Sequence, residues 1–162
     1  MHPVAFQPIS RHRFATRDDI IGRVVATPRP ALVVFHGAAG IGKSTTMGQV
    51  AETLAGDGAR AVWIGLSADD RGDDRFWRHV LTTVSAAGLA TESTLLAGLR
   101  DGGFVDRAQF GAIGAELAAI GEPIVIAFDD FHLAATPSIE DGLIELLAAA
   151  HSTCFSMALS HA

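Results

Sequence analysis

Residues 31–45 read ALVVFHGAAGIGKST, an apolar run that passes through a glycine-rich turn into a polar segment. Short apolar stretches that are rich in β-branched residues and bounded by proline and glycine are typical of buried strands. We therefore expect a strand over 31–36. The segment from Ser44 to Ala55 stops at Gly56-Asp57-Gly58 and has the pattern of a helix. The order of strand, turn and helix is typical of an α/β unit.

The turn from Gly37 to Ser44 matches the pattern G-x-x-x-x-G-K-[ST]. Its glycines allow the backbone to wrap closely around a small anion with the N–H groups pointing inward. A helix that begins at Lys43 adds unpaired N–H groups and the positive end of its dipole. The match therefore predicts a phosphate-binding loop rather than a plain connection between a strand and a helix.

Lys43 is the only lysine in the chain, and the other eleven basic residues are arginines. Its ammonium group would supply the point charge for the β- and γ-phosphates of a nucleoside triphosphate, and the Ser44 hydroxyl would ligate Mg²⁺. Thr45 is expected beside the α-phosphate. The predicted nucleotide-binding residues of this segment are Gly37, Ala38, Ala39, Gly40, Ile41, Gly42, Lys43, Ser44 and Thr45.

Residues 124–130 read IVIAFDD, an apolar strand that ends in two carboxylates. The carboxyl ends of parallel strands form the ligand edge of a sheet. Asp129 is therefore expected to orient Mg²⁺ through its water shell, and Asp130 to polarise an attacking water. Asp130 and Lys43 are the predicted catalytic residues. An aspartate is shorter than a glutamate by about 1.5 Å, so we expect slow hydrolysis.

The rest of the chain alternates between strand and helix patterns, which predicts a doubly wound parallel sheet of about four strands with helices on both faces. We assign residues 1–30 to an N-terminal segment and residues 31–162 to the nucleotide domain. Further strands are expected over 61–66, 123–128 and 153–159, and further helices over 16–26, 73–87, 91–100, 106–120 and 138–150.

Composition narrows the class of protein. The 162 residues suffice for one domain with a core, and a hydrophobic fraction of 49% argues against disorder. No apolar run approaches 18 residues, and the N-terminus lacks the pattern of a secretory signal. A single cysteine, Cys154, and a net charge of −6 predict a cytoplasmic protein that binds neither a membrane nor, by this chain itself, nucleic acid.

Two further stretches carry a resemblance to a known family. Residues 63–77, WIGLSADDRGDDRFW, resemble the signature W-L-S-L-D-x-x-D-N-D-P-x-R-F-W, and residues 129–133, DDFHL, resemble D-D-Y-H-L. Both signatures belong to the ATP-binding domain of MalT-like, large LuxR-type transcriptional regulators, in the STAND class of P-loop ATPases. Residues 11–14, RHRF, are similar to the R-P-R-L segment before that domain. The resemblance extends over about residues 9–161.

The resemblance implies a switch that binds ATP or ADP with Mg²⁺, self-associates, and acts on DNA through a C-terminal domain outside this chain. It also implies an arginine near the adenine, for which Arg13 is the closest match. The implied sheet order is 5-1-4-3-2, with the acidic strand third. Because the chain stops before a fifth strand, we expect residues 31–36 at a sheet edge, where an apolar strand favours self-association.

The chain departs from the family pattern at several positions. Ser67, Gly72 and Asp73 stand where the family has Asp, Asp and Pro. His161 stands where the family has an arginine that senses the γ-phosphate, and a histidine is shorter and only partly charged at neutral pH. This departure favours an alternative, a degenerate interaction module that binds nucleotide poorly or not at all.

A small-molecule kinase is a second alternative, because such kinases share the phosphate loop. They need an arginine-rich lid over the phosphates. Residues 91–108 contain only Arg100 and Arg107, which disfavours a kinase. A GTPase would need an N-K-x-D motif with a second lysine, which the chain does not have.

Overall fold

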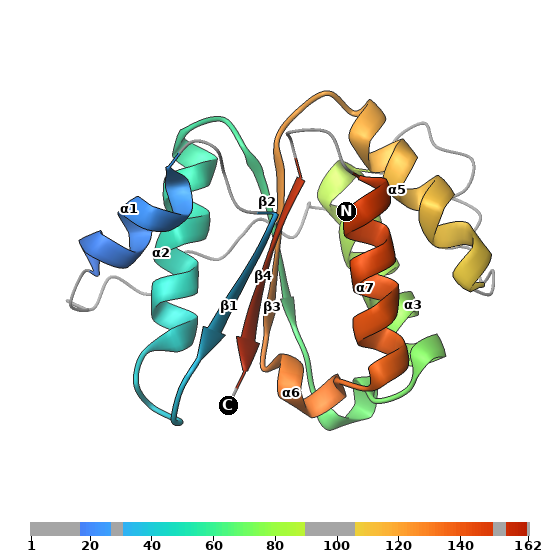
Figure 1. Ribbon diagram of the computed structural model, residues 1–162, viewed down its shortest axis with the longest axis horizontal. Helices are drawn as coiled ribbons and strands as arrows, with labels where there is room; N and C mark the ends of the chain where they lie inside the picture. Colours follow the sequence, from blue (N-terminus) through green and yellow to red (C-terminus); the bar gives the residue numbers. More distant parts are fainter. Residues whose placement is uncertain (1–16, 27–30, 90–105, 151–154, 162) are drawn as a thin grey trace.

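The computed structural model describes residues 17–26, 31–89, 106–150 and 155–161 (Figure 1). These residues form one parallel sheet with helices on both of its faces. In chain order the helices and strands are α1 (Asp18–Val25), β1 (Leu32–His36), α2 (Lys43–Gly56), β2 (Arg60–Gly65), α3 (Asp73–Val84), α5 (Phe110–Ala119), β3 (Ile124–Asp129), α6 (Phe131–Ala134), α7 (Pro137–Ala149) and β4 (Phe155–His161).

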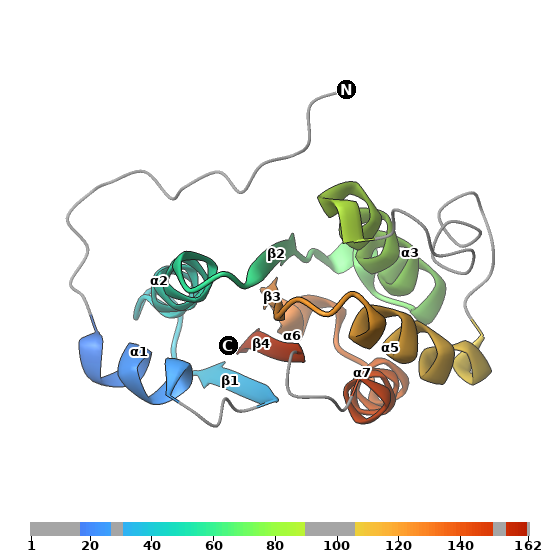
Figure 2. The ribbon, with the colours of Figure 1, turned by 90° about the horizontal axis from the view of Figure 1, so that it is seen from above.

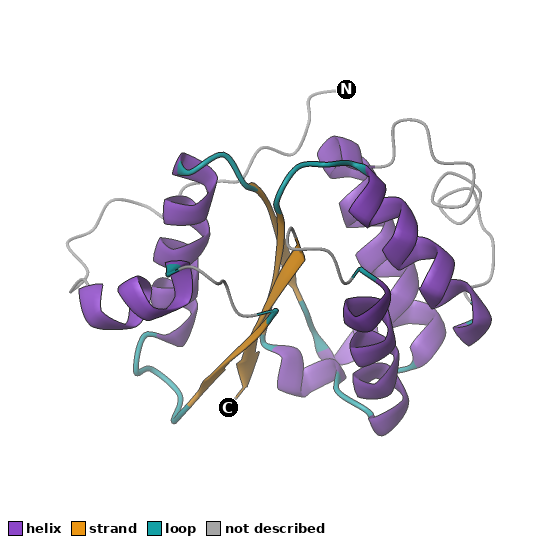
Figure 3. Ribbon diagram, turned by 45° about the horizontal axis from the view of Figure 1, so that its top comes forward, coloured by secondary structure: helices purple, strands orange, loops and turns teal. Residues whose placement is uncertain are grey.

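The sheet has the strand order β1-β4-β3-β2, and all of its strand pairs are parallel. This confirms the predicted α/β class, and its order agrees with the implied 1-4-3-2 part of the sheet. Figure 2 shows three layers, with α1 and α2 on one side of the sheet and α3, α5 and α7 on the other. Figure 3 shows the same separation of helices and strands. The carboxyl ends of β1 and β3 therefore reach the same edge of the sheet.

The main core lies between the sheet and the α3–α5–α7 layer. Its centre is a group of buried rings, in which Phe76 of α3 stacks on Phe128 of β3 with centroids 5.8 Å apart. All residues of β3 except Asp129 are buried, which explains why this strand reads as a continuous apolar run. A smaller cluster around Val50 and Leu54 joins the sheet to α2 and α1.

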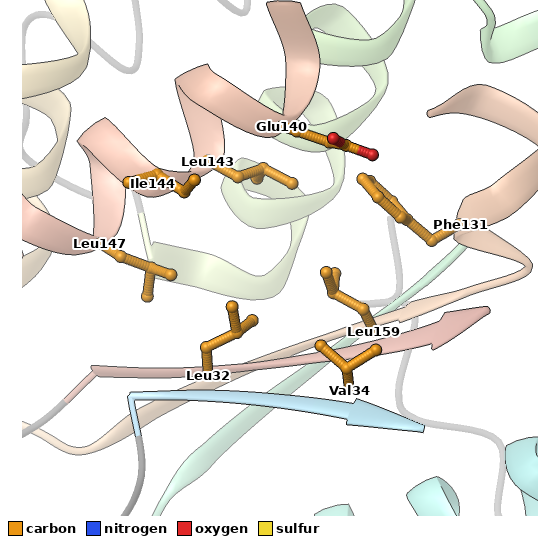
Figure 4. A pocket seen from close by; sticks show the side chains of 8 residues that line it. All are labelled: Leu32, Val34, Phe131, Glu140, Leu143, Ile144, Leu147 and Leu159. Carbon is orange, nitrogen blue, oxygen red and sulfur yellow. The ribbon is translucent and has the colours of Figure 1, made fainter. Parts of the chain in front are cut away.

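Coverage of the sheet is less complete at β1 than we expect from the sequence. Leu32 and Val34 are 40% and 53% exposed, and their side chains face the α7 side of the sheet (Figure 4). There they line an apolar groove of about 250 Å³ together with Leu159 of β4 and Ile144 of α7. The apolar pattern predicts a buried strand, but burial of this face depends on a covering element that the described residues do not provide.

Several element boundaries differ from the predicted ones. The helix predicted over 138–150 begins at Pro137, and its N-cap is Thr136, whose hydroxyl accepts from the Ile139 amide at 3.2 Å. The helix predicted over 73–87 ends as regular α-helix at Val84 and continues as a wider turn over Ser85–Leu89.

The last strand extends to His161, and the short helix α6 is not predicted from the sequence. The helix predicted over 91–100 lies outside the described residues. Among the helices that the structure describes, none has the length and apolar character needed to cross a bilayer.

Candidate functional site

The predicted phosphate loop connects the end of β1 to the start of α2, at the carboxyl edge of the sheet (Figure 1). Gly40 and Gly42 have φ values of 81° and 86°, a left-handed conformation that side chains with a Cβ adopt at a cost. Gly42 is also the N-cap of α2, and its carbonyl accepts from the amide and the hydroxyl of Thr46, both at 2.9 Å. The glycine positions of the motif are thus used for the backbone shape of the loop.

The side chain of Lys43 folds back onto the loop. Its Nζ donates to the carbonyl oxygens of Gly37 at 2.7 Å and Ala38 at 2.9 Å. An ammonium group has three donors, and these two carbonyls use two of them. The positive charge is therefore held against the loop, where a phosphate with negative charge would be attracted.

Ser44 and Asp129 lie 85 residues apart in the sequence but are in direct contact. The Ser44 hydroxyl donates to Oδ1 of Asp129 at 2.7 Å. The same carboxylate oxygen accepts from the amide of Asp130 at 3.1 Å. A hydroxyl and a carboxylate at this separation form an oxygen donor set of the kind that Mg²⁺ prefers. The structure thus brings together the two residues that the sequence predicts to be metal ligands.

Asp130 lies immediately after β3 and is exposed. It is the one non-glycine residue in the described part of the chain with a positive φ, at φ 55° and ψ 35°. Its carbonyl accepts from the Leu133 amide at 3.0 Å and so begins the short helix α6. Strained backbone of this kind is common at functional sites. Asp130 makes these hydrogen bonds through its backbone, whereas the carboxylate of Asp129 reaches the loop.

The remaining predicted residues are placed as follows. Thr45 lies in the first turn of α2 and is half-buried, and Ala38, Ala39 and Ile41 are exposed on the loop. The backbone of His161 pairs with His36, directly before the loop. Arg13 lies outside the described residues.

One residue near the loop is not among the predicted ones. Arg17, at the N-terminus of α1, donates from Nη2 to the carbonyl oxygen of Ile41 at 2.7 Å. A cavity of about 230 Å³ opens beside this contact. Its lining includes Arg17, Ile20, Val33, Phe35, Ile41 and Lys43. Nothing in the sequence pattern connects Arg17 to a loop that begins twenty residues later, so only the packing of α1 reveals it.

The acidic run over 69–74 differs from a fully solvated loop. Asp70 pairs with His79 of α3, with Oδ1 and Nδ1 2.9 Å apart, and its Oδ2 accepts from the Ser67 amide at 2.8 Å. Partial burial alone would raise the pKa of Asp70. The hydrogen bonds from the Ser67 amide, from His79 and from the Ser67 hydroxyl together outweigh burial and lower that pKa below its usual value.

No family model matches the chain. Three curated relatives are each named serine/threonine-protein kinase PknK and come from two strains of Mycobacterium tuberculosis and from Mycobacterium bovis. Each is 27% identical to this chain over 118 residues, which is 72% of this chain and 11% of the relative. The chain is therefore distantly similar to one short region of these much longer proteins, and this likeness leaves its family open.

Proposed function

We propose that this chain is a nucleotide-binding switch domain that holds ATP or ADP with Mg²⁺ in the loop from Gly37 to Ser44. The observation that carries the proposal is the 2.7 Å hydrogen bond between the Ser44 hydroxyl and Asp129. It unites a loop and an acidic strand end that the sequence separately predicts to bind a nucleotide and its metal. A chance glycine-rich turn would not require this contact.

The residues of the loop fit a magnesium nucleotide. The N–H groups at the start of α2 are unpaired within the helix and favour an anion. Lys43 adds a positive charge that the loop carbonyls already hold in place. Ser44 and Asp129 would hold Mg²⁺, directly or through water. Bound Mg²⁺ would neutralise phosphate charge, and the protein would supply the rigid arrangement around it.

We place the nucleoside in the cavity beside Ile41. Its lining combines apolar side chains, Ile20 and Phe35 among them, with the cationic groups of Arg17 and Lys43. An apolar surface next to positive charge suits a base that is joined to phosphates. Arg13 stays a prediction for the neighbourhood of the base.

Hydrolysis in this proposal is slow. Asp130 is exposed, and the carboxylate in contact with the loop belongs to Asp129. A general base must reach the water that it activates at about 2.6–3.2 Å, or through one further water. The short side chain and strained backbone of Asp130 therefore favour a protein that uses nucleotide binding as a signal over one that hydrolyses ATP rapidly.

As a regulator, the chain would resemble the MalT-like, LuxR-type switches that the signatures over 63–77 and 129–133 suggest. Self-association would use β1, which is an edge strand of the described sheet and carries the exposed side chains of Leu32 and Val34 on its α7 side. Contact with DNA would belong to another part of such a protein. The name of the kinase relatives gives no reason to assign kinase activity here, because the similarity covers 11% of their length.

The test is a titration with a fluorescent ATP analogue, with and without Mg²⁺. Lys43→Ala removes charge-assisted hydrogen bonds of about 1.5–3 kcal/mol, so we expect affinity to fall about 10- to 100-fold. Ser44→Ala should remove most of the Mg²⁺ dependence and keep metal-free binding. Arg78→Ala is the matched control, because it removes a positive charge that is exposed on α3, in the opposite helix layer.

Two results would contradict the proposal. If the wild-type chain binds no adenine nucleotide, the degenerate module is the better description. If the control variant loses as much affinity as Lys43→Ala, binding depends on overall charge and not on the loop. Faster turnover in the presence of a phosphoryl acceptor would favour the small-molecule kinase.

A further inference from the structure

Helix α1 is attached to the nucleotide domain at two places. Helix α1 lies beside α2 (Figure 2), and its partly buried residues Ile21, Val24 and Val25 pack against the small cluster that contains Val50 and Leu54. The second attachment is polar and lies at the other end of the helix, where Arg17 reaches the carbonyl of Ile41. None of the residues of α1 is fully buried, so the Arg17 contact is a substantial part of what connects this helix to the loop.

The Ile41 carbonyl belongs to the peptide that joins Ile41 to Gly42. In a planar trans peptide the C=O and N–H groups point in opposite directions. When Arg17 holds the Ile41 oxygen on the α1 side, the Gly42 N–H must point to the other side of that peptide. In a phosphate loop the N–H side is the side that contacts the anion.

The orientation of this peptide requires a contact from outside the loop, because the glycines on either side of Ile41 leave the backbone conformationally free. Gly40 and Gly42 both have positive φ, and glycine crosses between backbone regions at little steric cost. The loop also holds the Ile41 side chain, which lies so close to Gly37 that a Cβ at that position would clash with it. The carbonyl of Gly42 is already bonded to Thr46. The hydrogen bond from Arg17 to the Ile41 oxygen therefore adds the contact that restrains the peptide between Ile41 and Gly42.

We propose that Arg17 is a positioning residue, which orients the peptide between Ile41 and Gly42 so that the Gly42 N–H faces the phosphate. The inference rests on the proposed function and deepens it, because it names a residue outside the motif that sets nucleotide affinity. A loop in which this peptide samples two orientations binds more weakly in proportion to the fraction in the competent one. Loss of Arg17 should therefore weaken binding by about three- to tenfold.

The experiment combines binding with NMR of the Gly42 amide. For Arg17→Ala we expect about three- to tenfold weaker binding of Mg²⁺-ATP and of pyrophosphate, with an altered Gly42 N–H resonance before any ligand is added. The thermal midpoint should stay close to that of the wild type, because Arg17 is exposed. Arg17→Lys retains a charged donor and should restore most of the affinity and of the Gly42 shift.

Two further variants separate positioning from charge. Arg23→Ala removes the same charge from an exposed position in the last turn of α1, and should bind like the wild type. Arg17→Gln keeps an N–H donor without the charge and should lie between wild type and Arg17→Ala. The proposal would be overturned if Arg17→Gln bound as weakly as Arg17→Ala and Arg23→Ala lost the same affinity. Binding would then depend on overall charge and not on the position of Arg17.

The Gly42 resonance distinguishes failure of this inference from failure of the proposed function. If the wild-type chain binds no nucleotide, the proposed function fails, and a Gly42 shift in ligand-free Arg17→Ala still supports the orienting role. If the wild type binds nucleotide but Arg17→Ala leaves both the Gly42 resonance and the affinity unchanged, the positioning role is wrong while the proposed function stands.

Discussion

The contact between α5 and α7 provides a sharp test of the packing, because it passes through a glycine. A Cβ added at Gly114 would lie 2.7 Å from the Cβ of Ala149, 2.9 Å from the amide nitrogen of Ala150 and 3.0 Å from the carbonyl oxygen of Leu146. Two of these three atoms belong to the backbone of the α7 segment and cannot rotate away. Gly111, one turn earlier on the same helix, has no such neighbour within 4 Å.

The two glycines therefore predict opposite results for the same substitution. Gly111→Ala should stabilise the protein by a few tenths to about 1 kcal/mol, because alanine is the better helix former. At Gly114 the same gain is opposed by overpacking, which costs about 1–3 kcal/mol when the core must shift. Ordinary contact begins at 3.4 Å. The helices must then separate by roughly 0.5 Å, and we expect a net loss of about 1–2 kcal/mol.

Thermal unfolding of the three proteins checks this prediction. A change of 1 kcal/mol shifts the midpoint of a domain of this size by about 2–4 °C. Gly114→Ala should therefore melt about 2–8 °C lower than the wild type, and Gly111→Ala at the same temperature or slightly higher. If Gly114→Ala stabilises the protein as much as Gly111→Ala, the close approach of α5 and α7 described here is wrong.

Three other substitutions follow from particular contacts. Because the pKa of Asp70 is lowered by folding, its carboxylate stabilises the folded state above the ordinary value of 3.8 and loses this effect as pH falls through the lowered value. Asp70→Asn should thus be less stable than wild type in urea at pH 7, and a gap that does not narrow as the pH is lowered below 3.8 would contradict this origin. Thr136→Ala removes the N-cap of α7 and should cost about 1 kcal/mol in the same assay, whereas Thr136→Ser should cost little. Asp130→Gly relieves left-handed backbone and should leave the thermal midpoint unchanged or higher while lowering any ATP turnover, and a clear loss of stability would speak against that strain.

The sequence predicts those parts of the fold that depend on local pattern. The strand and turn over 31–42 are evident because β-branched residues and glycines have strong backbone preferences. The helical face of α3 is evident from the spacing of its apolar residues, and all of them are buried. Which strands the buried residues of α3 contact can be predicted only once the strand order is known. That order comes from the family resemblance and not from local pattern.

Contacts between distant segments account for what the sequence leaves open. Arg17 bonds to Ile41 across 24 residues, and no local preference indicates it. The N-cap of α7 is Thr136, directly before a proline that suits the first helical position. The hydroxyl of Ser138 donates a hydrogen bond to Asp73, 65 residues earlier in the chain. The family resemblance implies that residues 31–36 lie at a sheet edge, and β1 is an edge strand of the described sheet. The exposure of Leu32 and Val34 on the α7 side does not follow from the sequence, because an apolar strand has the same pattern whether or not a helix covers that face.

The strand order also determines when the site can form. Of the described strands β4 is the last to be synthesised, yet it lies between β1 and β3. Before residues 155–161 leave the ribosome, the described sheet has nothing that connects the loop strand to the strand carrying Asp129, and such non-local parallel pairing is slow to form. Nucleotide would then bind only after this strand is inserted. If the chain binds nucleotide as proposed, mass action would favour nascent chains that already contain β4 over shorter ones.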